Sequence, residues 1–456
     1  MAMTRVMKFG GSSVGSPEAL KRAAGIVVGT EGPRAVVVSA VAGITNFLIG
    51  VLEGEFESMD LVYKKFAERH MDVARQAFGK EQLSDFMEDF GPRLEAFKAL
   101  LKDEDARKDP YFVDNLMSQG ERFSSLLLAH AIRAAGADAV ALTSEEAGIV
   151  AHGNSQAATV DFAKTSINVN LNVKPLMADG SVPVITGFYG VGPKGQPITF
   201  GRGGSDYAAT ALGNALDADI VEIWTDVDGF MTSDPKVVPG AKVIDEMNYS
   251  EAAELAYFGA KVLHPRSVEP ARTKHIPIYI KNSHRPEAAG TRVHNLGRPN
   301  DDLLKAVAMK VDLSIITVNS AEIACKPRMV ARIIDAIAES DVCVYAISTS
   351  LSTIAFLIHN LDVKETLRNL NRVDSEIVEH INVKSNVALV CAVGDSLLAS
   401  QGFSGYVFGA VKDAGANVEM ISEGASDVSL NFVVPTDSVL DVVRTLHDRF
   451  ITGAGK

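Results

Sequence analysis

A glycine-rich turn carries two charged side chains at the point where a predicted strand gives way to a predicted helix. The turn, Phe200-Gly-Arg-Gly-Gly-Ser-Asp206, follows the strand-like residues 196–200 and precedes an apolar helix predicted over 207–216. The N–H groups and the positive dipole end at a helix start attract anions. Asp206 alone could simply be an acidic residue whose charge is stabilised by the helix dipole. Arg202 alone could be a solvated charge in a loop. Glycines around both charges favour a ligand-binding turn.

A second glycine turn near the N-terminus supplies a lysine. In Met7-Lys-Phe-Gly-Gly-Ser-Ser13, Lys8 lies near the end of a predicted buried strand. Gly10 and Gly11 let the backbone approach a ligand closely, and Ser12 adds a hydroxyl donor. The alternative is a lysine that extends its ammonium group into solvent. Together the two turns indicate phosphoryl transfer without a P-loop, because the sequence contains no GxxxxGK[ST] motif.

Two further patterns do not indicate a site. Residues 190–195 match GxGxxG, but strand-like residues follow them instead of a helix, so they are not a dinucleotide-binding fingerprint. His152 and His264 are isolated, and the sequence contains no HExxH motif. Zinc-hydrolase chemistry is therefore not expected.

A turn-rich segment over residues 225–235 follows another apolar run, residues 220–224. Its Asp-Gly and Asp-Pro pairs are ordinary turn signals. At the end of a strand, however, Thr225 and Asp226 could contact a nucleotide. Lys261, in Phe-Gly-Ala-Lys-Val-Leu-His-Pro265, could reach the phosphates of that nucleotide.

Short apolar runs that alternate with helical segments must position these residues. The predicted strands are residues 4–9, 35–39, 139–142, 182–186 and 220–224. This alternation predicts an α/β fold with a mostly parallel sheet. Ligands bind at the carboxyl ends of the strands in such sheets, and Lys8, Ser39, Thr225 and Asp226 are expected at those ends.

Three helical predictions accompany the strands. A helix is predicted to start at residues 16–18. Ser16 would be its N-cap, followed by Pro17 at the first helical position and the acidic Glu18 in the first turn. Residues 57–105 are charged and low in β-branched residues, which predicts a helical lobe. Residues 118–121, Ser-Gln-Gly-Glu, match a capping box and predict a helix that begins there and runs to Ala135.

Composition narrows the class of protein. The 456 residues predict two or three domains, and 47% hydrophobic with 22% charged residues is typical of a globular chain. A formal net charge of −13 argues against nucleic-acid binding. No apolar run is long enough to span a membrane, and the N-terminal residues enter a strand with no room for a signal peptide. Cys325, Cys343 and Cys391 are too few and too dispersed for a disulfide framework, so a reducing, cytoplasmic location is expected.

The C-terminal third contains an internal repeat. After a linker-like stretch at 296–302, residues 313–318 align with 387–392 at the same spacing that relates 347–352 to 421–426. Each unit reads as strand, helix, strand, turn, strand, helix. The pattern predicts two small ferredoxin-like modules.

Taken together, these motifs resemble those of the aspartate kinases in the amino-acid-kinase superfamily. The segments that carry the resemblance are 8–13, 39–46, 120–122, 201–206, 225–235 and 259–265, and the two C-terminal modules look like ACT domains. The resemblance covers essentially the whole chain. It implies an amino-acid-kinase fold over residues 1–297. In this fold a mostly parallel central sheet lies between layers of helices, and residues 57–105 form the helical lobe. Two ferredoxin-like (βαββαβ) ACT modules are then expected at 304–380 and 381–456.

The resemblance also implies an activity and residue roles. The expected reaction is ATP-dependent phosphorylation of the L-aspartate β-carboxylate to 4-phospho-L-aspartate, the first step toward lysine, threonine and methionine. Lys8 would bridge the phosphoryl group and the β-carboxylate, with Asp206 orienting Lys8. Arg202 would pair with the α-carboxylate and Glu121 with the ammonium group, although a capping box alone also explains Glu121. Ser39, Thr45 and Ser205 would line the aspartate pocket. ATP, carrying Mg²⁺ with no direct protein ligand, would be bound by Lys8, Gly10, Gly11, Ser12, Thr225, Asp226, Met231, Asp234, Lys236 and Lys261.

The ACT-like modules imply feedback inhibition by lysine, threonine or both, and a homodimer or tetramer formed through these modules. Tyr345 stands where lysine-inhibited relatives commonly carry an acidic residue. Modules that only dimerise are the alternative. The candidate effector residues are Asn319, Ser320, Ile323, Ser348, Thr349, Ser350 and Ser352.

Two other functions stay open on the sequence. One is another amino-acid kinase, acting on glutamate or carbamate. This alternative is disfavoured by the segments 39–45 and 120–122 and by the paired C-terminal modules. The other is a catalytically silent amino-acid sensor, which intact Lys8, Arg202 and Asp206 disfavour. A bifunctional kinase and homoserine dehydrogenase would need a longer chain.

Overall fold

The computed structural model divides the chain into two compact units, each described here by itself. The first comprises Met1–Phe230, Val243–Ala253 and Lys261–Arg298, and the second Met231–Lys242, Glu254–Ala260 and Pro299–Lys456. The residues that the structure describes are 3–259, 262–296, 304–320, 326–340, 342–373, 377–394, 397, 401–424 and 426–452.

An eight-stranded sheet forms the centre of the first unit, in the order β10-β12-β11-β9-β1-β2-β6-β3. Neighbouring strands are parallel except for β11 and β12, which run antiparallel. The strands are β1 (Arg5–Phe9), β2 (Arg34–Val38), β3 (Ala139–Leu142), β6 (Val182–Thr186), β9 (Ile220–Thr225), β10 (Glu246–Asn248), β11 (Ile278–Asn282) and β12 (Thr291–His294). Two pairs of short strands lie outside this sheet, β4 (Ala151–His152) with β5 (Thr159–Val160) and β7 (Tyr189–Val191) with β8 (Pro197–Thr199).

The five predicted strands are present and occupy the middle and one edge of this sheet. Val36, Val37 and Val38 in β2 are fully buried, as are Val6 and Met7 in β1. Apolar side chains on both faces are typical of parallel strands covered by helices on both sides. The predicted α/β fold is confirmed.

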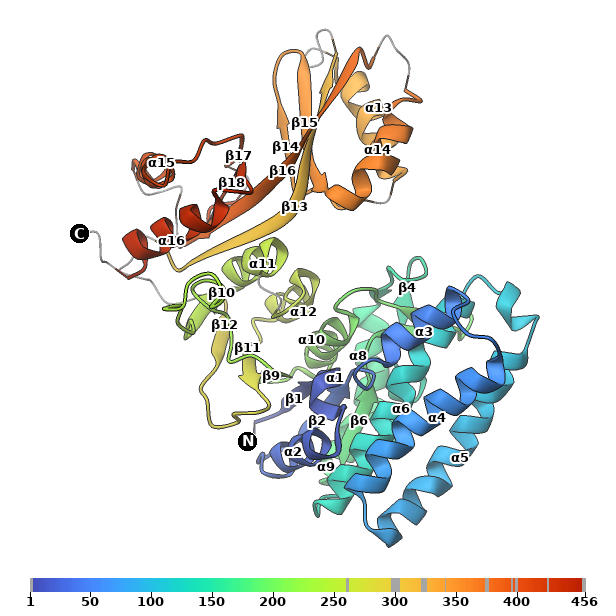
Figure 1. Cartoon of the computed structure of the whole chain (residues 1–456). Coiled ribbons are helices and arrows are strands. Elements are labelled where there is room, and N and C mark those ends of the chain that lie inside the picture. The colour runs from blue at the N-terminus through green and yellow to red at the C-terminus, as the bar shows by residue number, and fades with distance from the viewer. Residues whose placement is uncertain are drawn as a thin grey trace. The chain divides into compact units, whose positions relative to one another are not determined.

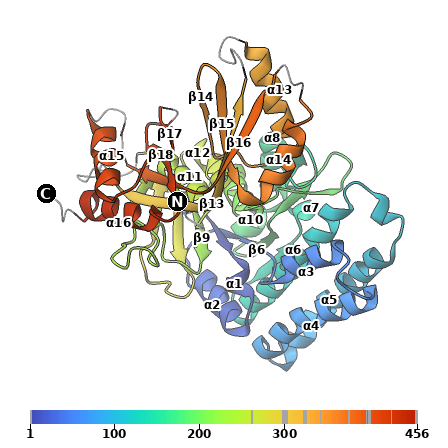
Figure 2. The same ribbon diagram turned by 45° about the horizontal axis from the view of Figure 1, so that its top comes forward.

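Helices surround the sheet of the first unit (Figures 1 and 2). They are α1 (Gly11–Val14), α2 (Pro17–Val28), α3 (Ile44–Leu52), α4 (Met59–Ala77), α5 (Lys80–Lys102), α6 (Phe112–Ala134), α7 (Ser144–Ala147), α8 (Phe162–Asn172), α9 (Lys174–Ala178), α10 (Gly204–Leu216), α11 (Tyr249–Phe258), of which the last part belongs to the second unit, and α12 (Glu269–Arg272). Short 3₁₀ turns span Ala106–Lys108 and Pro265–Ser267. The helical stretch predicted over 57–105 consists of α4 and α5, which lie side by side next to α6 in both views.

The predicted start of the helix at Ser118 is wrong. α6 begins at Phe112, six residues earlier, so Ser118 lies inside the helix and its hydroxyl donates to the Asn115 carbonyl at 2.8 Å. The serine thus bonds back to the preceding turn instead of capping a free N–H group. Glu121 is therefore not part of a capping box, and its burial needs another explanation.

One continuous six-stranded antiparallel sheet forms the second unit, in the order β14-β15-β13-β16-β18-β17. Its strands are β13 (Ala306–Asn319), β14 (Ala346–Thr349), β15 (Thr353–His359), β16 (His380–Val393), β17 (Met420–Ser422) and β18 (Ser429–Pro435). Its helices are α13 (Pro327–Ala338), α14 (Val363–Leu370), α15 (Phe403–Asp413) and α16 (Val439–Phe450), with a 3₁₀ turn at Asn360–Asp362.

The two repeats share their longest strands. The C-terminal half of β13 pairs with β15, whereas residues 306–310 at its start pair with residues 389–393 at the end of β16. α13 and α14 cover one core, which includes Ile316, Ile333 and Phe356. α15 and α16 cover another, which includes Val390, Phe432 and Leu446. Each ferredoxin-like module therefore completes its sheet with half of β13 and half of β16.

Residues 231–242 contribute to the second core although they precede most of that unit in sequence. Val237 and Val238 are buried in the cluster that contains Val307 and Phe403. The N–H of Val307 donates to the Thr232 carbonyl at 2.9 Å, and further bonds join this segment to α16. The segment is thus an integral part of the second unit.

Candidate active site

The ammonium group of Lys8 and the carboxylate of Asp206 form an ion pair at the carboxyl ends of the central strands. Their Nζ and Oδ1 atoms are 2.6 Å apart, and the two side chains are only 10% and 15% exposed. Lys8 lies in β1, between Val37 of β2 and Ile223 of β9. Asp206 lies in the first turn of α10. The structure thus brings together the lysine of one glycine turn and the aspartate of the other.

The backbone of the 201–206 turn requires glycine at two positions. Gly201 and Gly203 have φ angles of +77° and +71°, in the left-handed region that L side chains rarely adopt. A Cβ atom on Gly203 would lie 2.2 Å from the Cβ of His264, and one on Gly201 would lie 2.3 Å from the Gln156 carbonyl oxygen. No side chain caps the start of α10. The N–H of Gly204 donates to the Gly201 carbonyl at 3.0 Å, which leaves the N–H groups of Ser205 and Asp206 as the donors at this helix start.

Arg202 and Ser205 occupy this turn in different environments. Arg202 is exposed, and no ion pair to it occurs within the part of the chain that the structure describes. Ser205 is 8% exposed and packs against Gly187, where a Cβ atom would lie 2.8 Å from that of Ser205. The guanidinium group is accordingly available for a ligand at the start of α10.

Glu121 lies on α6 with 4% of its surface exposed. Its Oε1 accepts a hydrogen bond from the N–H of Ala40 at 3.0 Å. Burial raises the pKa of the Glu121 carboxyl group to about 8, although the Ala40 hydrogen bond and the positive charge of Lys8 act in the opposite direction. The influence of Lys8 places Glu121 in the same electrostatic environment as the ion pair.

The loop after β2 connects α6 to the other residues expected in the aspartate pocket. The hydroxyl group of Ser124 donates to the Ser39 carbonyl at 2.7 Å, and Gly120 approaches Ala40 so closely that a Cβ atom would lie 2.6 Å from its methyl group. Ser39 is half-buried at the end of β2, and Thr45 is exposed in the first turn of α3.

The expected nucleotide residues lie in several parts of the chain. Gly10 precedes α1 in extended conformation, and Gly11 lies so close to the Ala40 carbonyl that a Cβ atom would be 2.5 Å from its oxygen. Ser12 is exposed in α1. Thr225 ends β9, and its hydroxyl group donates to the Asp226 carboxylate at 3.2 Å. Met231, Asp234 and Lys236 belong to the second unit, and Lys261 lies outside the described residues.

Two residues that the sequence reasoning missed hold the glycine turn in place. Asp114, fully buried on α6, accepts hydrogen bonds at one oxygen from the N–H of Thr199 (2.7 Å), the hydroxyl group of Thr199 (2.6 Å) and the N–H of Gln156 (3.1 Å). Arg266 donates to the Phe200 carbonyl at 2.9 Å and stacks on the Tyr207 ring. Arg266 follows the His-Pro pair directly, but nothing in the sequence around Asp114 signals its role.

Family models and relatives agree on one group of enzymes. The model of the Amino acid kinase family matches residues 3–282, and an ACT domain model matches residues 390–450. The chain is 34% identical to lysine-sensitive aspartokinase 3 of Escherichia coli (strain K12), over 97% of this chain and 98% of the relative. It is 30% identical to the chloroplastic aspartokinase 2 of Arabidopsis thaliana, over 98% and 84% of the two chains.

The chain belongs to the aspartokinases of the amino acid kinase family.

Solved structures of this family have the same fold over the whole chain. The complex of E. coli aspartokinase III with aspartate and ADP, described as its R-state, has a TM-score of 0.82 at 32% identity and covers 98% of this chain and 99% of that one. The T-state complex of that enzyme with lysine and aspartate has a TM-score of 0.83. The resemblance inferred from the motifs is confirmed.

The candidate effector residues of this aspartokinase lie where β13 ends and β14 turns into β15. The N–H of Ser320 donates to the Ser352 carbonyl at 2.9 Å, and Asn319 pairs with Thr353 across the sheet. The hydroxyl groups of Ser350 and Thr353 lie 2.6 Å apart. Ser348 and Thr349 end β14, and Ile323 lies outside the described residues.

The described residues contain no group of three or more His, Cys, Asp or Glu side chains that could hold a metal ion. Among the described helices, none is long and apolar enough to cross a bilayer.

Proposed function

We propose that this aspartokinase transfers the γ-phosphoryl group of ATP to the β-carboxylate of L-aspartate and releases 4-phospho-L-aspartate. The observation that carries the proposal is the buried Lys8–Asp206 pair at the strand ends between two glycine turns. The E. coli relative of the same fold binds aspartate and ADP. The reaction would be the first step toward lysine, threonine and methionine, in the cytoplasm.

The chemistry needs charge neutralisation more than proton transfer. A carboxylate is ionised at neutral pH, so the attacking oxygen needs no general base. The γ-phosphoryl group moves between two anions, and positive groups aimed at its oxygens lower the barrier. Lys8 would supply that charge between donor and acceptor. Asp206 would hold the ammonium group in position, and the free N–H groups at the start of α10 would add donors.

The substrate would be oriented by groups around the glycine turn. Arg202 would form a bidentate pair with the α-carboxylate, a geometry that suits the guanidinium group. Glu121 would accept from the α-ammonium group, whose positive charge would favour the ionised carboxylate. Ser39, Thr45 and Ser205 would line the rest of the pocket.

ATP would be bound near Gly10, Gly11 and Ser12 and at the end of β9, with Thr225 and Asp226. The family resemblance also implies nucleotide-binding roles for Met231, Asp234, Lys236 and Lys261. Mg²⁺ bound to the ATP phosphates would supply further charge neutralisation.

Regulation and assembly are proposed for the second unit. A feedback amino acid, lysine or threonine, would bind at the Asn319, Ser320 and Ser348–Ser352 end of the sheet, since a T-state complex of the relative contains lysine. Two copies would associate through the ACT modules.

Trapping of the acyl phosphate tests the proposal directly. Hydroxylamine converts an acyl phosphate to a hydroxamate, so the enzyme with ATP, Mg²⁺ and L-aspartate should give aspartyl hydroxamate in step with ADP. L-Glutamate in place of L-aspartate serves as the control. Preferential formation of hydroxamate from glutamate would indicate an amino-acid kinase with a different substrate. If aspartate does not stimulate ADP formation, the chain would instead be a catalytically silent amino-acid sensor.

A further inference from the structure

A cavity of about 380 Å³ lies in the first unit on the side of α6 that faces away from Glu121. Gly120, Glu121 and Ser124 project from one side of this helix toward the β2 loop, whereas Asn115, Gln119 and Arg122 project from the other side and line the cavity. The volume is within the range of pockets that hold small molecules. None of the proposed aspartate or nucleotide residues lines it.

The walls of the cavity combine cationic and apolar groups. Arg93 of α5 and Arg122 of α6 supply two guanidinium groups, and Leu100, Phe123 and Pro197 supply apolar surface. Gln119, which is 9% exposed, adds an amide whose nitrogen donates to Asn115 at 3.1 Å. Such a lining suits a ligand with an anionic end and a short apolar body.

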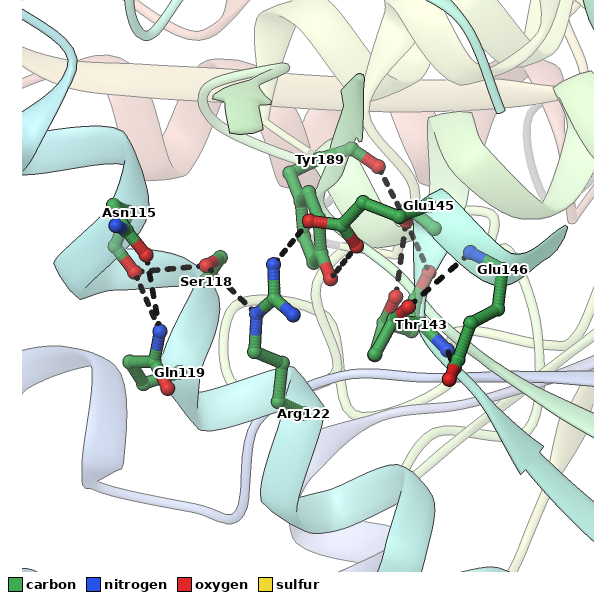
Figure 3. Close-up of polar contacts among 10 residues, drawn as sticks. Asn115, Ser118, Gln119, Arg122, Thr143, Glu145, Glu146 and Tyr189 are labelled. Atoms are coloured by element: carbon green, nitrogen blue, oxygen red, sulfur yellow. Dashed lines mark hydrogen bonds and ion pairs between the residues drawn. The ribbon is translucent and has the colours of Figure 1, made fainter. Parts of the chain in front are cut away.

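Arg122 is already paired inside the protein. Its guanidinium group forms an ion pair with Glu145, its Nε donates to Ser118 at 3.4 Å, and it lies over the Tyr189 ring (Figure 3). Glu145 also accepts from the Tyr189 hydroxyl group at 2.9 Å, and Glu146 accepts from the N–H of Thr143 at 2.7 Å. Glu145, which lines the cavity, and the neighbouring Glu146 are therefore both engaged.

Arg93 differs from Arg122 because no carboxylate forms an ion pair with it in the described part of the chain. One Nη atom donates to the Arg122 carbonyl at 2.5 Å, which fixes the guanidinium group beside the cavity. Burial lowers the pKa of Arg93, while the charges of Glu146 and Asp89 act on it from beyond pairing distance. A half-buried guanidinium group with unused donors is a strong site for a carboxylate or phosphate.

We propose that this cavity is a second ligand site, which binds a small carboxylate or phosphate anion carried on an apolar body, with Arg93 as the principal anion-binding group. The net charge of −13 repels anions at long range, so binding depends on local donors, chiefly the guanidinium group of Arg93. The site is independent of the proposed phosphoryl transfer.

Calorimetric titrations at constant ionic strength test the site with three probes: benzoate, phenyl phosphate and inorganic phosphate. The variants are Arg93→Met, which removes the charge at similar length, and Ala96→Phe, which fills the cavity from α5 and leaves both arginines in place. Arg75→Met is the matched control, because it removes an exposed arginine of α4 that does not line the cavity. Arg202→Met is tested beside it to detect binding in the proposed aspartate pocket. Thermal unfolding checks that each variant is folded.

The expected result is saturable binding of benzoate or phenyl phosphate, tighter than that of inorganic phosphate. Binding should weaken at least about tenfold in Arg93→Met and in Ala96→Phe and stay unchanged in Arg75→Met. The better of the two organic probes identifies the anionic group of the natural ligand. The absence of saturable binding would exclude the site, and so would equal affinity for all three probes. Loss of probe binding only in Arg202→Met would also exclude it, because the probe would then occupy the aspartate pocket.

Discussion

At the scale of single residues, the Lys8–Asp206 pair has the greatest consequence for the reaction. A lysine that is 8% exposed is held at 2.6 Å from its carboxylate partner, so its charge is fixed before any substrate arrives. Fixed charges cost no reorganisation when the phosphoryl group moves, and this is the main source of electrostatic catalysis.

Lys8→Met should lower kcat for hydroxamate formation by about 10²–10³-fold, because the transition state loses its central positive charge. The thermal midpoint should fall only slightly, since the methionine side chain fits the same space. Steady-state kinetics with Lys21→Met, an exposed lysine on α2, provide the control. A near-normal kcat in Lys8→Met would rule out the proposed role.

Glu121 should make aspartate use depend on pH. With a pKa of about 8 in the free enzyme, its carboxyl group is mostly neutral at pH 7 and becomes an acceptor for the ammonium group as the pH rises. We expect kcat/KM for L-aspartate to increase through about pH 8. Glu121→Gln should lower kcat/KM and abolish this step, and a step that persists in Glu121→Gln would assign it to another group.

His70 should limit stability in acid. Its ring is fully buried against Phe66 and against Phe123 of α6, and burial lowers its pKa to about 4. The unfolded state, with a pKa of about 6.5, binds a proton first, so stability is lost as the pH falls below that value.

Between about pH 7 and about pH 5 the free energy of unfolding should drop by about 2 kcal/mol through this residue. His70→Phe should flatten that part of the profile in urea unfolding. His152→Gln, at an exposed position, should leave the profile unchanged. Equal acid sensitivity in all three proteins would contradict the prediction.

At the scale of elements, α6 is the support of the site. From one helix, Asp114 fixes the strand before the glycine turn, Glu121 reaches Ala40, and Ser124 holds Ser39. The helix thus sets the distance between two walls of the proposed aspartate pocket.

Asp114→Ala should raise KM for L-aspartate and destabilise the fold by at least about 2 kcal/mol, because it leaves buried N–H and hydroxyl donors without an acceptor. All three bonds end on one carboxylate oxygen, so Asp114→Asn keeps an equivalent acceptor and should recover most of the loss. The comparison uses denaturant unfolding and aspartate saturation curves. If Asn behaves like Ala, the negative charge and not the acceptor is what matters.

Much of this arrangement was predictable from the sequence, and the limits have physical causes. The strands were predictable because buried parallel strands are continuous apolar runs, and the glycine turns because only glycine tolerates their backbone and close contacts. The start of α6 was missed because Ser118 and Glu121 imitate a cap inside a helix. The role of Asp114 was missed because its partners, Thr199 and Gln156, lie far along the chain.

At the scale of the whole molecule, the repeat predicted the two modules but not their shared strands. Spacing in sequence indicates where a strand recurs, but not that β13 and β16 each run through both modules in one sheet. That pairing depends on contacts between the start of β13 and the end of β16.

Removal of residues 304–456 should leave an unstable, aggregating chain. Val237 and Val238 would lose the core that buries them, at about 1.5–3 kcal/mol for each side chain. Size-exclusion chromatography and thermal unfolding measure the effect. Replacement of both valines by serine in the truncated chain should restore part of its solubility. If the truncated chain with the native valines is monodisperse and active, the prediction is wrong.

Segments of the two units alternate along the chain three times each, and this order restricts how such enzymes can be recombined. A graft of residues 299–456 from a relative would bring a foreign core to the recipient's own Met231–Lys242 and Glu254–Ala260 segments. Exchange of the whole second unit between relatives therefore requires three segments, and with them five breakpoints, to be transferred together. A single breakpoint after residue 298 yields a mismatched interior, so divergence by point substitution is the more accessible route.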